Sequence, residues 1–161
     1  IKKNNLFQYP TERQVSRLAR ACYKRLDALG NDQLVHELAS APNDIAKQIN
    51  LYAVMRYNRL VWEFMIQVIG EKYRNQDMNF SRKDMNAFFS RLQAQDDSVA
   101  AWSDATITKI KSVLVRMLIE TGYLDGLKDT TLNPVFLCEE LERGIEANND
   151  YDALSAFSYF T

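Results

Sequence analysis

The chain has 161 residues, of which 47% are hydrophobic and 25% are charged, enough to bury the core of one domain or of two small helical lobes. Three Pro and five Gly exclude collagen-like, low-complexity and disordered classes, whereas the net charge of −1 decides nothing about partners. No apolar run reaches the roughly 18 to 20 residues that a membrane helix needs, so we expect a cytoplasmic protein with no membrane partner.

The first predicted helix begins after Thr11 and ends at Gly30. Thr11 is a typical N-cap, and Gln14 three residues later completes a capping-box pattern. One face of this helix is an apolar stripe of Val15, Leu18, Cys22, Leu26 and Leu29. The opposite face carries four cations, Arg13, Arg17, Arg20 and Lys24.

A short helix is predicted over residues 32–40, and a long helical stretch follows over residues 44–73. The apolar face of this stretch changes side halfway along. Either the helix breaks within residues 55–58, or it is a central element that contacts different neighbours along its length. We favour a buried central element with a kink.

The second half begins with a helix that Ser81 caps, with Asp84 at the capping-box position. A short helical turn over residues 97–102 comes next. Ser103 then caps a helix from Asp104 to Thr121, which Gly122 ends.

The helical period is lost after Gly122. Two β-prone pairs, Tyr123-Leu124 and Thr131-Leu132, flank a polar stretch and predict a small β-hairpin. Asn133, with Pro134 at the next position, predicts a helix that runs to about Ala147. A last short helix is expected over residues 150–157.

These elements predict an all-α, mainly helical bundle with winged helix-turn-helix character and one short β-hairpin. Helix, short helix, long helix and hairpin over residues 81–132 follow the order of a winged helix-turn-helix. We expect an N-terminal lobe over residues 1–79, with the basic first helix and the long central helix. The C-terminal lobe, residues 80–161, would hold the winged-helix-like unit and the terminal helices.

Catalytic patterns are missing from the sequence. His36 is the only histidine, and Cys22 and Cys138 lie far apart without a CxxC spacing. There is no glycine-rich phosphate-binding motif, and the acidic residues near the C-terminus wind around an amphipathic helix. We therefore expect no enzyme activity, no catalytic residues, no metal and no cofactor.

Charge is unevenly distributed along the chain, and this pattern favours a polyanionic ligand. Residues 1–25 hold seven Lys/Arg against one acid, residues 26–119 eleven of each, and residues 120–161 two against nine. The chain begins with Ile1 rather than Met, so we expect further residues before this basic segment. A cationic row on one helix face is relieved of its own repulsion by a polyanion. It could instead dock on the acidic C-terminal region or on a partner protein.

The long helix that Ser103 caps offers hydroxyls and cations near its start, groups that suit phosphate oxygens. Lys109 and Arg116 could equally be solvated charges of an amphipathic helix. The candidate DNA-binding residues are Arg13, Arg17, Arg20, Lys24, Ser103, Thr106, Thr108, Lys109, Ser112, Arg116 and Lys128.

A further pattern of residues extends over roughly residues 44 to 141. It consists of Arg56-Tyr-Asn-Arg-Leu-Val-Trp-Glu-Phe64, Glu71-Lys-Tyr73, Asn86-Ala-Phe-Phe89, Trp102-Ser103, Thr106, Lys109-Ile-Lys111, Val113-Leu114, Arg116-Met-Leu118, Glu120-Thr-Gly-Tyr-Leu124 and Asn133-Pro134. In these residues the sequence resembles the BrxA family of the bacteriophage exclusion (BREX) systems. The resemblance implies an all-helical protein with winged-helix character that binds double-stranded DNA. It also implies antiviral defence alongside the methyltransferase, alkaline-phosphatase-like and ATPase components of the system.

Three functions therefore compete. The first is a non-enzymatic DNA-binding accessory protein of phage defence. The second is a protein interaction scaffold in the defence complex that uses Trp62, Tyr73 or the acidic C-terminal helix and does not bind DNA. The third, a hydrolase, would need clustered carboxylates that the sequence does not place together.

Overall fold

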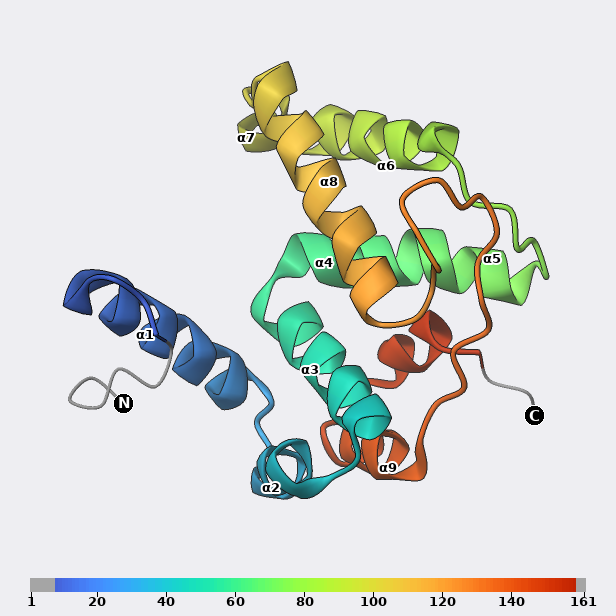
Figure 1. Ribbon diagram of the computed structural model, residues 1–161. Helices are drawn as coiled ribbons and strands as arrows, with labels where there is room; N and C mark the ends of the chain where they lie inside the picture. The colour runs from blue at the N-terminus through green and yellow to red at the C-terminus, as the bar shows by residue number, and fades with distance from the viewer. Residues whose placement is uncertain (1–7, 159–161) are drawn as a thin grey trace.

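A computed structural model describes residues 8–158, and this range is mainly helical, as predicted (Figure 1). Lys2 and Lys3, which belong to the basic N-terminal segment, lie outside the described residues. The helical elements are α1 (Glu12–Ala28), α2 (Asp32–Ser40), α3 (Asn43–Tyr57), α4 (Arg59–Phe64), the π-helical η1 (Met65–Gly70), α5 (Glu71–Arg74), α6 (Arg82–Gln95), α7 (Asp97–Ala100), α8 (Asp104–Glu120), α9 (Glu139–Ala147) and the 3₁₀-helical η2 (Tyr151–Ala156).

Side-chain caps start three of the longer helices where the sequence predicts. The hydroxyl of Thr11 accepts a hydrogen bond from Gln14 N–H, and that of Ser103 accepts one from Thr106 N–H. At α6 the hydroxyl of Ser81 accepts from Lys83 N–H, while the Asp84 carboxylate accepts from Ser81 N–H at 2.7 Å. These caps satisfy backbone donors that the first helical turn leaves without a partner.

The long helical stretch over residues 44–73 breaks at Asn58, within the range that the sequence marked. Asn58 has an extended backbone and ends α3, while its side-chain oxygen accepts from Leu60 N–H and so starts α4. Both parts are central all the same, because each places large side chains in the core. The break turns α4 away from the axis of α3 (Figure 1).

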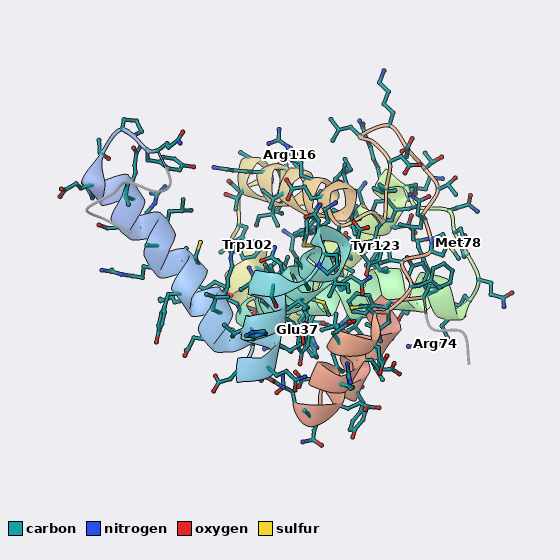
Figure 2. The ribbon with its side chains drawn as sticks, turned by 60° about the horizontal axis from the view of Figure 1, so that its bottom comes forward. Glu37, Arg74, Met78, Trp102, Arg116 and Tyr123 are labelled. Carbon is teal, nitrogen blue, oxygen red and sulfur yellow. The ribbon has the colours of Figure 1, made fainter. Side chains whose placement is uncertain are left out.

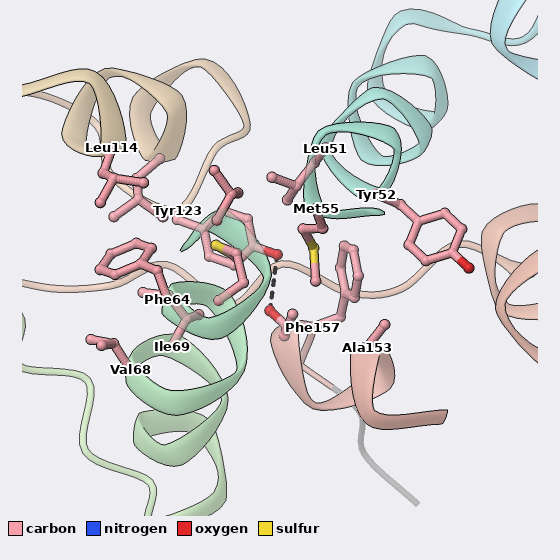
Figure 3. Packing of buried hydrophobic residues seen from close by; sticks show 14 of the residues in the cluster. Leu51, Tyr52, Met55, Phe64, Val68, Ile69, Leu114, Tyr123, Ala153 and Phe157 are labelled. Carbon is pink, nitrogen blue, oxygen red and sulfur yellow. Dashed lines mark hydrogen bonds between the residues drawn. The ribbon is translucent and has the colours of Figure 1, made fainter. Parts of the chain in front are cut away.

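The core lies where α3, η1, α8 and η2 meet, as Figure 3 shows. Fully buried Phe64 and Tyr123 belong to it, and the Tyr123 hydroxyl donates to the Ala156 carbonyl at 2.9 Å. One core cluster draws residues from both sides of the expected boundary between residues 79 and 80. The division into two lobes stays a prediction.

The predicted β-hairpin over residues 123–132 does not form in the described chain. Its second half pairs instead with the segment before α6: Phe80 N–H donates to the Thr130 carbonyl at 2.8 Å, and Leu132 N–H to the Met78 carbonyl at 2.7 Å. Its first half closes the end of α8, because Tyr123 N–H donates to the Leu118 carbonyl. The two halves thus form backbone hydrogen bonds with other segments of the chain in place of a hairpin.

The helix predicted from Asn133 to Ala147 starts later, at Glu139. Two distant side chains hold the preceding residues in an extended conformation. The Tyr73 hydroxyl donates to the Asn133 carbonyl and accepts from Val135 N–H, while Gln48 bonds the backbone of Phe136 and Cys138. These bonds take backbone groups that a helix would use for itself.

Candidate nucleic-acid interface

A groove of about 1040 Å³ runs between the start of α6, one face of α8 and the loop that follows α8. Figure 1 shows this orange loop beside the green segment that leads into α6. The side chains that line the groove are of three main kinds: apolar, hydroxyl-bearing and cationic. The lining residues are Phe80, Ser81, Arg82, Met85, Asn86, Thr108, Lys111, Ser112, Val115, Arg116, Leu124, Leu127, Lys128, Asp129 and Thr130.

Four cations reach the groove: Arg82 from α6, Lys111 and Arg116 from α8, and Lys128 from the loop. We call these four residues the groove cations. None of them forms an ion pair with a carboxylate in the part of the chain that the structure describes. Asp129 is the only acid in the lining. The groove therefore offers net positive charge to a ligand.

Helical geometry accounts for the residues that α8 contributes. At about 100° per residue, positions 108, 111, 112, 115 and 116 share one side of the helix, next to the side that enters the core. Figure 2 shows Arg116 on α8 pointing away from the body of the molecule. The face of α8 beside its core stripe is therefore the wall of the groove.

Lys111 is held in place before any ligand arrives. Its ammonium group donates to the Asn86 side-chain oxygen at 2.8 Å and lies 5.2 Å from the centroid of the Phe89 ring. The cation–π contact and the hydrogen bond fix a charge whose aliphatic stem is partly buried. Lys111 therefore links the core to the groove.

Four of the predicted DNA-binding residues meet at this groove: Thr108, Ser112, Arg116 and Lys128. The Ser112 hydroxyl donates back to the Thr108 carbonyl at 3.0 Å and keeps its oxygen available as an acceptor. Arg82 and Lys111 were missed. Arg82 reads as an ordinary first-turn residue, and Lys111 sits next to the core stripe of its helix, so neither carried a signal in the sequence.

Three further predicted residues lie outside the groove lining: Thr106 and Lys109 on α8, and Ser103 at its N-cap. The Ser103 hydroxyl is used as the helix cap and lies 3.0 Å from the Thr106 hydroxyl. Lys109 is exposed on the same helix. The start of α8 thus presents one exposed cation and a pair of hydroxyls that already stabilise the helix end.

The row of Arg13, Arg17, Arg20 and Lys24 is exposed along α1, and within residues 8–158 none of the four forms an ion pair. Helix α1 packs on α3 near its C-terminal end and projects from the body (Figure 1). In both Figure 1 and Figure 2, α1 lies on the left of the molecule and the loop after α8 lies on the right. The structure therefore presents two separate cationic surfaces.

Other cations of the described chain serve the fold. Lys72 lies 3.0 Å from both Asp77 and Asp84; burial alone would lower the pKa of this lysine, but these hydrogen bonds raise it. Arg56 donates to the Leu29 carbonyl at 2.8 Å and pairs with Asp150. Lys72 and Arg56 therefore have carboxylate partners, in contrast to the groove cations.

Metal and membrane signatures are missing from residues 8–158. No group of three or more His, Cys, Asp or Glu side chains there converges to hold a metal ion. His36 is exposed on α2, beside the Ser40 hydroxyl. No helix among these residues combines the length and apolarity needed to cross a bilayer.

Comparisons with known proteins place these features in context. The BrxA family model matches residues 1–149. A "BREX protein BrxA" of Bacillus cereus is 37% identical over 124 residues, which are 77% of this chain and 62% of that protein. The chain thus spans about three fifths of that relative's length. A second protein of the same name, from Paramagnetospirillum magneticum, is 22% identical over 93% of this chain and 75% of its own length.

The fold also matches a solved structure. The crystal structure of an uncharacterized protein from Magnetospirillum magneticum superposes with a TM-score of 0.79 at 22% identity. The match covers 95% of this chain and 77% of the other. This likeness concerns the fold alone.

Proposed function

Since this chain belongs to the BrxA family, we propose that it is a non-enzymatic accessory protein of a bacterial BREX phage-defence system that binds double-stranded DNA. The observation that carries the proposal is the groove with its four cations. A duplex presents a regular line of phosphates, and Arg and Lys neutralise them with release of counterions. The hydroxyls of the same lining suit further phosphate contacts.

The order of elements around the groove supports a winged-helix-like mode of binding. Helices α4 and α5 are followed by the segment 78–80, then α6, α8 and the loop, whose residues 130–132 pair back with 78–80. In this proposal α8 enters the major groove and the loop lies over the adjacent backbone. The loop takes the place of the wing, although a single isolated bridge replaces a strand ladder.

Helix α1 supplies a second contact in this proposal. Because its cations lie on the opposite side from the loop, they would contact phosphates that the groove does not reach. A duplex bound at both surfaces would extend past the body of the protein. Reversing the charge in an Arg17→Glu/Arg20→Glu variant is then expected to weaken binding.

The test is a salt titration of DNA binding by fluorescence anisotropy with a duplex of mixed sequence. Affinity should fall steeply between about 50 and 200 mM salt. In an Arg116→Ala/Lys128→Ala variant, the negative slope of log affinity against log salt should become less steep by about two. The matched control, Lys47→Ala/Arg143→Ala, removes two cations that pair with Asp44 within α3 and with Glu139 within α9, away from the groove lining, and should leave the slope unchanged. Equal slopes in all three proteins would refute the groove as the DNA site.

An interaction scaffold is the second candidate, and one observation favours it. The acidic helix α9 exposes Glu139 and Glu146, and Phe136 and Tyr151 are large exposed side chains of the flanking segments. Partners would be the methyltransferase, alkaline-phosphatase-like and ATPase components. Co-purification that survives nuclease treatment and charge reversal at both cationic surfaces, together with no DNA binding, would support this function over the first.

A further inference from the structure

The loop after α8 contains a tight turn whose tip carries one apolar and one cationic side chain. Asp129 N–H donates to the Gly126 carbonyl at 3.2 Å, so Leu127 and Lys128 are the central residues of a four-residue turn. Both line the groove. The chain thus places Leu127 where polar residues are usual.

Leu127 is 72% exposed, more than any other large hydrophobic side chain of residues 8–158. A single exposed leucine is common on protein surfaces and by itself indicates nothing. Here the backbone around it is fixed. Asn133 donates to the Asp125 carboxylate at 2.8 Å, Leu124 is buried, and Thr130 is bonded to the segment before α6. These contacts anchor the backbone on both sides of the turn that carries the exposed Leu127.

The surroundings of Leu127 indicate what it would contact. Lys128 is its neighbour in the turn, and Arg116 and Arg82 reach the same groove. A base step of a duplex offers an apolar stack beside lines of phosphates, which matches an apolar tip in a groove lined by cations. An apolar pocket on a partner protein would not need these charges.

We propose that Leu127 enters the minor groove and wedges into a base step, so that the protein bends the DNA that it binds. This inference rests on the proposed function. Apolar wedges of this kind unstack a step and kink the duplex by about 20–90°. Pyrimidine–purine steps, which deform most readily, would be preferred. Lys128 would hold the adjacent phosphate.

Ligase-catalysed ring closure of DNA fragments shorter than about 150 bp tests the bend, because such fragments are too stiff to close readily on their own. The full chain is used at a concentration that saturates the DNA, as measured by anisotropy in parallel. We expect the unsubstituted protein to accelerate ring closure. The Leu127→Ala variant should still bind and should close rings only at the rate of free DNA.

Two further variants separate the wedge from other causes. Tyr151→Ala, which removes a 57% exposed aromatic side chain of η2 outside the groove lining, should keep full acceleration. Lys128→Ala should weaken binding but still bend the DNA at saturation. A Leu127→Ala protein that accelerates ring closure as well as the unsubstituted protein overturns the wedge. Binding without any acceleration overturns this inference alone, whereas absence of binding overturns the proposed function and the wedge together.

Discussion

Substitution of Gly144 by alanine should destabilise the protein, although alanine is the better helix former. Gly144 lies inside α9, where α9 crosses α2. A Cβ atom built there would lie 2.5 to 2.6 Å from three side-chain atoms of Leu34. Leu34 is 1% exposed and belongs to the core, so it cannot swing into solvent. One of the two helices would have to shift.

Two opposing terms set the magnitude. Replacing glycine by alanine in a helix gains about 1 kcal/mol, whereas overpacking a core costs about 1–3 kcal/mol. Because three atoms of one buried side chain are too close, we expect the upper part of that range and a net loss of about 1–2 kcal/mol. In a chain of this size the melting temperature should fall by roughly 2–8 °C.

Urea unfolding followed by circular dichroism measures this change. Gly126→Ala is the control, because the nearest atom to its new Cβ lies 3.7 Å away. A double-mutant cycle with Leu34→Ala tests the cause. The cavity that Leu34→Ala leaves can hold the new methyl group, so the double variant should lose less free energy of unfolding than the two single variants lose together. Additive losses within about 0.5 kcal/mol, or a Gly144→Ala protein as stable as its parent, would refute the steric argument.

Three further outcomes follow from the caps and the titrating groups. Ser103→Ala should cost about 1 kcal/mol in urea unfolding, because α8 loses the acceptor for Thr106 N–H. Burial alone would raise the pKa of Asp84, but hydrogen bonds from Lys72 and Ser81 lower it below 3.8. The ionised Asp84 carboxylate therefore stabilises the fold at neutral pH, and this contribution is lost as the pH falls below that value. In a Lys72→Met variant the free energy of unfolding, measured in the same assay, should depend less on pH in this acidic range. Burial raises the pKa of Tyr52 to about 12, so its contribution to stability should hold below pH 10 and fall between pH 10 and 12. Burial also raises the pKa of Tyr73 to about 12, so ultraviolet titration of Tyr52→Phe should keep a late tyrosinate step with a smaller amplitude.

Local signals predicted the helix starts, because a cap needs only its own side chain and the next three residues. Thr11, Ser81 and Ser103 all cap as expected. For the long stretch over residues 44–73 we favoured a buried central element with a kink over a break. The structure has a break at Asn58, whose side chain caps α4, and both α3 and α4 nevertheless contribute to the core.

Long-range bonds explain the two errors in the fold. Gln48 and Tyr73 lie 60 or more residues from the backbone groups that they bond, and those bonds keep the chain before α9 extended. Pairing of Thr130 with Phe80 took the second half of the expected hairpin. The hydrophobic periodicity of a short sequence segment does not predict hydrogen bonds between residues so far apart in the chain.

The same distinction applies to the candidate site. Residues of α8 were predicted because a helix of known phase turns them to one side. Arg82 joins them because the segment before α6 lies beside the loop, a long-range pairing. Lys111 shares their side of α8, and its contacts with Asn86 and Phe89 of α6 are likewise long-range. The row on α1 was correctly predicted as exposed, but its separation from the groove depends on how α1 packs against α3.

The hydrogen bond between Phe80 and Thr130 joins opposite walls of the groove at one end. Rotation of a side chain cannot widen the opening there, since the backbones themselves would have to separate. The backbone atoms of Phe80 and Thr130 consequently set the distance between the walls at this end, whereas the side chains of the lining set its charge. Substitution of Arg116 or Lys128 would therefore change the charge of the lining, while the two backbones stay joined at this end of the groove.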